Sequence, residues 1–463
     1  MEFRTETDSL GDVQVPAAAY YGAQTARSVT NYPISGVRVH RSLVESYALL
    51  KQVAAQVLAE LGLLDAERAG AIAAAAAEVL DGKLKDEFVV DAFHSGAGTS
   101  FHMNVNEVLA GRANEILTGR RGGRQPVHPN DHVNMAQSTN DTFPSAMRIA
   151  ARREVVRLVH ALRGLEHALA DKGDSLRGVV KAGRTHLQDA VPVSLGQELA
   201  AYGSSAGQAR VALAAAEHWL EELPIGGSAV GTGLNTHPQF RFRVVERLAA
   251  ATGIPFRPAG DLRAAMQSNF AISLLSSCLR SAALEVSRIA NDLRLLASGP
   301  ATGLGEIDLP PVQAGSSIMP GKVNPSLAEM VNMVCFQVIG NDAAVAWAVG
   351  AGQLELNVMM PVMAHNVLQS IEILTNALQV FTARCVAGIT AQVERCRRHA
   401  ESSVALATVL NPRIGYDRAA EIVKEALASG RTVLEVAHER SGIPEAELRA
   451  LFDVSAMTEP RST

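Results

Sequence analysis

Hydrophobic residues recur at intervals of three and four along most of this 463-residue chain. Such spacing puts apolar side chains on one face of an α-helix, so it predicts helices rather than strands. The pattern is strongest over five long stretches: 147–171, 193–223, 265–298, 326–349 and 361–392. The third contains neither proline nor glycine, and its length corresponds to a helix of roughly 50 Å. The pattern therefore predicts an up-and-down bundle of five long helices.

Shorter patterns flank this predicted bundle. Residues 1–45 are rich in turn formers, and helical spacing begins at 43–63 and continues in an alanine-rich stretch at 66–80. Beyond residue 394 we expect three short helices, at 418–428, 432–440 and 445–452. We therefore predict three domains: a mainly helical N-terminal domain, 1–139; the central long-helix bundle, 140–394; and a small helical C-terminal domain, 395–463.

Composition supports a helical protein and argues against some classes of partner. Hydrophobic residues make up 48% of the chain but aromatic residues only 4%, which is typical of helices packed through small side chains. The net charge of −5 provides no basic surface for nucleic acid. Alanine and serine on the long helices leave faces able to pack on more helices than one chain supplies. We therefore expect the bundle to form an oligomer.

The cysteines and the N-terminus predict a cytoplasmic protein. Four cysteines (Cys278, Cys335, Cys385 and Cys396) show neither CxxC nor zinc-site spacing, which favours reduced thiols. Residues 1–12 are polar and acidic and carry no apolar signal region. We find no run of the roughly 18–20 apolar residues needed to span a bilayer, so no membrane partner is expected.

The most informative segment is 315–325, which reads GSSIMPGKVNP. It combines two adjacent hydroxyls, an ammonium and an amide between glycines and prolines that shape the backbone. This segment resembles the signature loop of the fumarase/aspartase superfamily almost residue for residue. Three further segments resemble its other signature regions, namely 96–100, 128–141 and 183–189. Shorter similarities at 231–235, 289–292, 340–342 and 355–358 extend the resemblance over nearly the whole chain.

The resemblance implies an all-α, three-domain fold with a central five-helix bundle. It also implies a homotetramer in which four such bundles form a twenty-helix core. Active sites of this family are assembled from three different subunits. No cofactor and no metal ion are expected.

The activity implied is β-elimination from a C4 dicarboxylate, releasing fumarate. By resemblance, Ser316 is the base that removes the Cβ proton, His186 is the active-site histidine, and Glu329 is its acidic partner. The residues that the resemblance assigns to substrate binding are Thr99, Ser100, Ser138, Thr139, Asn140, Thr185, His186, Ser317, Lys322 and Asn324.

These residue types suit the chemistry. Removing a proton next to a carboxylate gives an aci-carboxylate with a second negative charge, which is costly unless cations and N–H donors already surround it. Lys322 supplies a full charge, and the hydroxyls and amides supply directional hydrogen bonds. A serine base needs a strongly lowered pKa, which a loop closing on the substrate can provide. The glycine- and proline-rich connector 300–314 is a candidate hinge.

The signature loop does not separate ammonia-lyases from hydratases. Segments 96–100 and 137–141 resemble aspartases, whereas 23–25 and 361–366 resemble class II fumarases. His102 stands where both branches have Asn, and Met360 stands where aspartases have Glu. We favour aspartate ammonia-lyase, with fumarate hydratase or a lyase for another or N-substituted aspartate as alternatives. A non-enzymatic relative, like the lens proteins of this superfamily, is disfavoured because the chemical residues are intact.

Overall fold

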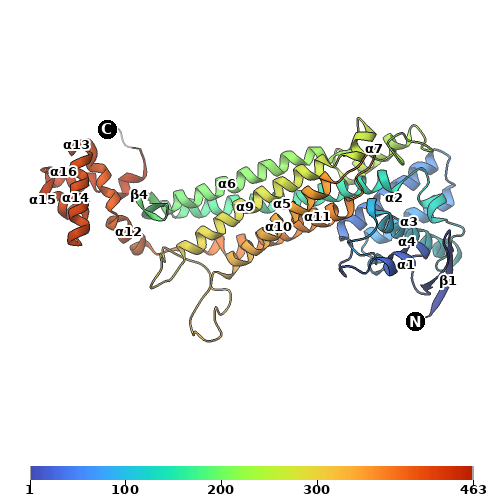
Figure 1. Ribbon diagram of the computed structural model, residues 1–463, viewed down its shortest axis with the longest axis horizontal. Coiled ribbons are helices and arrows are strands. Elements are labelled where there is room, and N and C mark those ends of the chain that lie inside the picture. The colour runs from blue at the N-terminus through green and yellow to red at the C-terminus, as the bar shows by residue number, and fades with distance from the viewer. Residues whose placement is uncertain (1, 461–463) are drawn as a thin grey trace. The chain divides into compact units, whose positions relative to one another are not determined.

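The computed structural model describes residues 2–460, and this part of the chain is mostly helical (Figure 1). The all-α prediction is therefore confirmed. The strands form four small sheets of two strands each among the described residues. They are β1 (Phe3–Asp8) with β2 (Gly11–Pro16), β3 (Val180–Thr185) with β4 (Gln188–Ser194), β5 (Glu222–Leu223) with β6 (Arg257–Pro258), and β7 (Ile307–Asp308) with β8 (Thr390–Ala391).

The chain forms two compact units. Unit 1 contains the chain up to residue 159 with 211–283 and 336–374, and unit 2 contains 160–210, 284–335 and the chain from 375 onward. Each unit is therefore built from segments that lie far apart in the sequence. The predicted three-domain boundaries stay a prediction.

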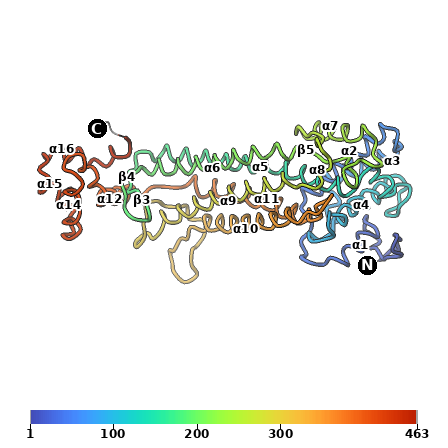
Figure 2. The backbone as a smooth tube through the Cα atoms, turned by 45° about the horizontal axis from the view of Figure 1, so that its top comes forward, coloured from blue at the N-terminus to red at the C-terminus, as the bar shows by residue number. Residues whose placement is uncertain are grey.

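The five long helices are close to those predicted. They are α5 (Thr139–Ser175), α6 (Leu195–Glu217), α9 (Phe270–Leu296), α10 (Ser326–Gly350) and α11 (Met360–Arg384). Every one contributes a segment to each unit, and within each unit these segments run alongside one another (Figures 1 and 2). The largest differences are at α5 and α11. The helix α5 begins eight residues before the predicted stretch, since its first turn is polar and carries no apolar signal, and α11 ends eight residues before the predicted end.

Unit 1 also contains the N-terminal helices. They are α1 (Ala23–Asn31), α2 (Arg41–Glu60), α3 (Ala66–Leu80) and α4 (Thr99–Thr118), with short 3₁₀ or π turns at Lys85–Glu87, Gly96–Gly98 and Pro129–Val133. The predicted helices at 43–63 and 66–80 correspond to α2 and α3. Asp65 explains why α3 starts at Ala66, because its carboxylate accepts a hydrogen bond from the Arg68 backbone N–H at 2.9 Å.

The remaining helices are short. Sequence periodicity did not predict α7 (Phe240–Thr252), α8 (Leu262–Gln267) or the hairpin of β3 and β4. In unit 2 the described residues after α11 form five short helices: α12 (Val393–Ser402), α13 (Asn411–Ile414), α14 (Tyr416–Ser429), α15 (Val433–Arg440) and α16 (Glu445–Leu451). The 3₁₀ turns of this part of unit 2 are Val386–Gly388, Val404–Leu410 and Val454–Thr458. Unit 1 has a further 3₁₀ turn at His218–Leu220. The last three predicted helices match α14, α15 and α16. Leu410, Ile422 and Val436 lie in the hydrophobic core that these elements share.

Two helices are more apolar than expected from the sequence. By length and composition alone, α9 and α10 would each be able to cross a membrane, so the expectation that no segment qualifies was wrong. Core helices of soluble proteins meet the same criterion. Half of the apolar window of α9 is buried within the chain, but only 28% of that of α10. The helix α10 therefore leaves an apolar surface uncovered by the described residues.

Candidate active site

Thr99 and Ser100 lie at the start of α4, in a turn that glycine makes possible. Gly98 has φ +95°, and a Cβ placed on it would lie 2.0 Å from the Phe143 ring. The turn is anchored because the Ala97 N–H donates to the Val358 carbonyl at 2.7 Å. Thr99 is exposed at the helix N-terminus, where backbone N–H groups and the helix dipole favour an anion.

Ser138, Thr139 and Asn140 lie at the start of α5, where the buried Asp141 carboxylate shapes the backbone. It accepts N–H groups from Ser138 at 2.9 Å and from Gly226 and Ser228 at 3.0 Å each. Burial raises the pKa of Asp141 to about 6, although these three N–H groups oppose the increase. Asn140 is held by its own amide, whose Nδ2 donates to the Ala229 carbonyl at 2.8 Å. Its Oδ1 therefore remains available as an acceptor.

A buried polar cluster connects α2, α4 and α5 behind these hydroxyls. The His102 ring contacts Thr139 Oγ1 through Nδ1 at 2.7 Å and Lys51 Nζ through Nε2 at 2.9 Å. Lys51 also donates to Asn134 Oδ1 at 3.0 Å. Burial lowers the pKa of Lys51 to about 7 and the pKa of His102 well below its usual range. The cluster thereby joins the two predicted binding segments of unit 1.

Thr185 and His186 lie in unit 2, at the turn between β3 and β4. Thr185 pairs with Gln188, so His186 and Leu187 form a two-residue loop, and their φ angles are +57° and +58°. Two positive φ values are the signature of a type I′ turn, which normally takes Asn-Gly; non-glycine residues there are strained. Thr185, His186 and Leu187 are all exposed. The turn thus presents the histidine ring away from the sheet to which it is attached.

The base of this hairpin is held by a buried carboxylate. Glu306 is fully buried and accepts two hydrogen bonds from Arg184, at 2.8 and 3.1 Å. Lys181 Nζ lies 3.3 Å from it, and His399 Nδ1 lies 2.9 Å from it. Burial disfavours its ionisation, but the Arg184 hydrogen bonds and the Lys181 charge bring the pKa of Glu306 below its usual value. Because Glu306 lies within the connector 300–314, it links the histidine hairpin to the base of the serine loop.

The serine loop is closed at its neck and open at its tip. Gly315 N–H donates to the Lys322 carbonyl at 2.8 Å, and Asn324 Nδ2 donates to the Gly315 carbonyl at 2.7 Å. Ser316 Oγ accepts the backbone N–H groups of Ile318 at 3.2 Å and Met319 at 3.0 Å. Two N–H donors at one hydroxyl oxygen stabilise an alkoxide more than an alcohol, as a serine base requires.

The other loop residues face solvent. Ser317 and Lys322 are exposed, and Asn324 is half-buried. Glu329 lies in the first turn of α10, and no hydrogen bond or ion pair links it to His186 within the described residues. The pairing of His186 with Glu329 therefore stays a prediction.

The predicted residues thus form two sets. The structure joins Thr99, Ser100, Ser138, Thr139 and Asn140 in unit 1, and it places Thr185, His186, Ser316, Ser317, Lys322, Asn324 and Glu329 in unit 2. Sequence reasoning missed Lys51, Asp141 and Glu306, since a charged residue inside a helical or loop pattern gives no signal of its burial. His102 was noticed only as a departure from the family pattern.

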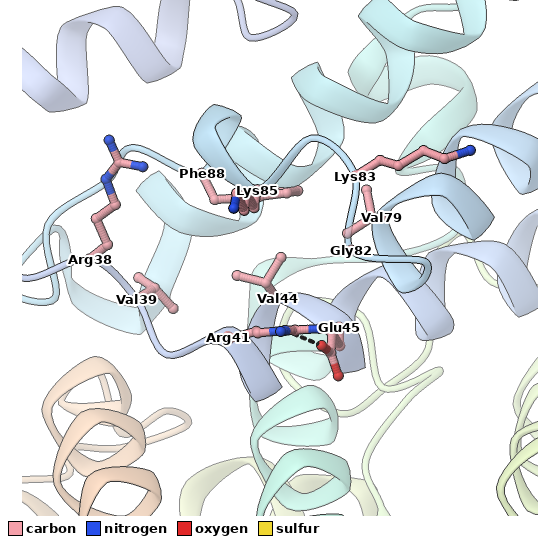
Figure 3. Close-up of a pocket in the computed structure, with 10 residues that line it drawn as sticks. All are labelled: Arg38, Val39, Arg41, Val44, Glu45, Val79, Gly82, Lys83, Lys85 and Phe88. Carbon is pink, nitrogen blue, oxygen red and sulfur yellow. Dashed lines mark hydrogen bonds and ion pairs between the residues drawn. The ribbon is translucent and has the colours of Figure 1, made fainter.

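One pocket of unit 1 contains none of these residues. It is lined by the segment before α2, by α2, by α3 and by the loop after α3, with Val39, Val44 and Phe88 among the residues around it (Figure 3). Arg41 and Glu45 pair across one side at 2.6 Å, while Lys83 extends away from the cavity (Figure 3). We therefore assign the site by chemistry and not by this cavity.

Comparison with known proteins identifies a single family over the chain. Residues 11–340 match a family described as Lyase, and residues 406–459 match one described as Fumarase C C-terminus. A class II fumarate hydratase of Halobacterium salinarum is 50% identical and covers 99% of this chain and 97% of its own. An aspartate ammonia-lyase of a Bacillus species is 44% identical, covering 99% and 98%. A crystal structure of a fumarate lyase:delta crystallin from Brucella melitensis superposes with a TM-score of 0.95 at 46% identity, covering 99% of this chain and all of that one.

Proposed function

The chain belongs to the fumarase/aspartase superfamily of lyases, and we propose that it is an aspartate ammonia-lyase, forming fumarate reversibly from L-aspartate. The observation that carries the choice is the resemblance of segments 96–100 and 137–141 to aspartases. These two segments lie at the starts of α4 and α5, where His102 connects them, an arrangement that suits either leaving group. They supply the hydroxyls and the amide that we assign to substrate binding.

In the proposed reaction, the Ser316 alkoxide removes a proton from Cβ of aspartate. The electron pair moves into the adjacent carboxylate, forming the aci-carboxylate, and then forms the Cα–Cβ double bond as ammonia leaves Cα. The Ile318 and Met319 N–H groups make Ser316 more acidic by stabilising the alkoxide. The positive charge of Lys322 stabilises the aci-carboxylate.

The ammonium group of the proposed substrate needs hydrogen-bond acceptors in the site. Because Asn140 donates its amide N–H to Ala229, its oxygen is oriented to accept from an ammonium. His186, Thr185 and Asn324 are further acceptors in the predicted set. This arrangement lets the substrate ammonium bind without a competing fixed charge, while Lys322 is directed at a carboxylate.

Class II fumarate hydratase is the second candidate. It is favoured by the fumarase-like residues 23–25 and 361–366 and by the 50% identity to the Halobacterium salinarum enzyme. Both activities use a C4 dicarboxylate and differ in the leaving group. A lyase for another or an N-substituted aspartate remains a third alternative, suggested by Met360.

Ultraviolet absorbance of fumarate tests the choice directly. The purified protein is incubated separately with L-aspartate and L-malate, with Ser316→Ala as the control for contaminating lyases. We expect fumarate to appear from aspartate and the reverse reaction to consume fumarate only when ammonium is added. Fumarate formed from malate alone would establish the hydratase and contradict the ammonia-lyase.

We propose, further, that the chain forms a homotetramer through its long helices. Met333, Phe336 and Trp347 of α10 are 63%, 61% and 83% exposed, and their spacing places them on one helical face. An apolar face of this kind is buried by another helix in a stable assembly. Sedimentation should give a tetramer; a fully active monomer would contradict shared active sites.

The free thiols of all four cysteines fit the cytoplasmic location that we propose.

A further inference from the structure

His102 occupies an unusual place in the buried cluster of unit 1. Its ring is 1% exposed and is stacked on Tyr47, with centroids 5.6 Å apart and 29° between the planes. It touches no solvent and cannot reach a ligand itself. Its Nδ1, however, contacts Thr139 Oγ1 at 2.7 Å, and Thr139 is a residue that we assign to the substrate.

The neighbours of Nε2 determine which ring nitrogen carries the proton. Lys51 Nζ lies 2.9 Å from Nε2, and Asn106 Nδ2 lies 3.1 Å from it. A protonated Lys51 can only donate, and Asn106 also directs its Nδ2–H toward Nε2. Nε2 is therefore the acceptor, and the proton lies on Nδ1.

The position of this proton determines the direction of the hydrogen bond between His102 and Thr139. Because Nδ1–H donates to Thr139 Oγ1, the hydroxyl proton of Thr139 must point elsewhere. Apart from the histidine, no hydrogen-bond partner of this hydroxyl is found among the residues described, so its proton has no acceptor there. Thr139 is the first residue of α5, at a helix N-terminus, where a carboxylate would be the favoured acceptor.

We propose that His102 is a positioning residue that makes the Thr139 hydroxyl an obligatory donor to a substrate carboxylate, with Lys51 and Asn106 fixing the tautomer of its ring. The inference rests on the proposed binding of a C4 dicarboxylate at Thr139. It holds for an ammonia-lyase and for a hydratase alike. According to this proposal, the His102 ring orients the Thr139 hydroxyl and does not only pack against its neighbours.

The protonation state of Lys51 determines how strongly the Thr139 hydroxyl is kept as a donor. Charged Lys51 can only donate, whereas neutral Lys51 can also accept from Nε2–H and would then allow Thr139 to donate to Nδ1 instead. The titratable groups that face the cluster are Tyr47 on α2 and Asp141 on α5, and the polar groups are Asn106 on α4 and Asn134 after the π turn. Dicarboxylate affinity should therefore fall as pH rises through the range in which Lys51 loses its proton.

Calorimetric titration with succinate, a dicarboxylate that cannot react, tests the proposal in the full-length protein. We expect His102→Leu and Thr139→Val each to weaken binding about tenfold, as loss of a hydrogen bond to a charged group does. The double variant should be no weaker than the worse single variant, because both remove the same donor. His102→Asn, which keeps an N–H to donate, and Thr139→Ser, which keeps the hydroxyl, should bind within about threefold of wild type.

Two results would overturn the positioning role. One is a double variant in which the two losses of succinate affinity multiply, and the other is wild-type affinity in a folded His102→Leu. Should His102→Leu not fold, a pH profile of succinate affinity in His102→Asn replaces it: this variant should lose the decline near neutrality that wild type shows, and an unchanged decline would overturn the proposal. The exposed His167→Leu on α5 serves as the control and should match wild type. Absence of succinate binding to the wild-type protein would refute the proposed function and this inference together, whereas turnover of malate and not aspartate would refute only the former.

Discussion

Thr139 and His186 show how differently the chain holds its two sets of predicted site residues. Thr139 is buried and bonded to His102, and the same first turn of α5 is held to Gly226 and Ser228 through Asp141. His186 is exposed on a strained two-residue turn. The binding set of unit 1 is thus fixed from behind by buried polar groups. The set of unit 2 is held at the base of the hairpin by Glu306 and at the neck of the serine loop by Gly315 and Asn324, while His186 and Lys322 are exposed.

This difference indicates a division of labour. Hydroxyls that bind a carboxylate gain from rigid placement, because the cost of ordering them is met on folding. A serine base and a lysine in an exposed loop are incomplete by themselves, since both need surroundings that exclude water. The exposed set would acquire such surroundings from other subunits and from the substrate.

Ser316→Ala should have the largest effect on activity. Losing a base in this position should lower kcat about 10³-fold, because proton removal then lacks an acceptor. The melting temperature should stay close to wild type, since Ser316 lies in an exposed loop and its hydroxyl only accepts two local N–H groups. Gln313→Ala in the same connector is the control for the loop and should keep full activity. Residual activity within about tenfold of wild type would end the assignment of Ser316 as base.

Glu306→Gln should have the largest effect on stability. It removes the carboxylate that pairs with the half-buried Arg184 at 2.8 Å and leaves the buried Lys181 with only Glu198, at 3.2 Å. Breaking a buried ion pair in this way costs about 3 kcal/mol of unfolding free energy. The pKa of Glu306 is lowered in the folded protein, so this stability is present above the ordinary carboxylate range and is lost as pH falls. Urea denaturation at neutral pH measures it.

A surface ion pair of the same unit provides the control. Glu394 pairs with Arg397 at 2.7 Å, and both side chains are mostly exposed. Glu394→Gln should leave the urea midpoint unchanged. Equal effects at Glu306 and Glu394 would show that the base of the hairpin is not held by its buried carboxylate.

Lys51→Met should change the pH dependence of stability in a smaller but diagnostic way. The folded pKa of Lys51 is about 7, below the ordinary lysine value, so the unfolded chain binds more protons above pH 7. Wild-type stability should therefore gain up to about 1.4 kcal/mol per pH unit as pH rises from neutrality toward the unfolded pKa. The variant should lack this gain. An identical slope in both proteins would show that Lys51 does not titrate inside the cluster.

Much of the fold could be predicted from local pattern. The helices α2, α3 and α10 begin within two residues of their predicted starts, because apolar periodicity and capping residues act within a few positions. The hairpin carrying His186 was not predicted, since its turn lacks the usual Asn-Gly. The helix α7 was also missed, because arginines alternate with its apolar residues near its start.

The site was only partly accessible to sequence reasoning. Resemblance identified the hydroxyls, the histidine and the loop, all carried by local motifs. The groups behind them could not be found in this way: Lys51 and His102 are about 50 residues apart in sequence, and only tertiary packing of α2 on α4 and α5 brings them together. Burial also determines their charge, and burial of a single lysine in a helical pattern cannot be read from the sequence.

A subunit-mixing assay tests most directly whether the rigid and the exposed sets meet in a site shared between chains. Thr139→Val and Ser316→Ala, one from each set, are unfolded together, refolded, and assayed for fumarate formation; two affinity tags confirm that mixed oligomers form. Ser316→Ala with Lys322→Ala, both from one loop, is the control, because that loop comes from a single chain in every site. We expect the first mixture to regain activity well above either parent and the second to regain none. Confirmed mixed oligomers of the first pair without any recovered activity would contradict the shared site.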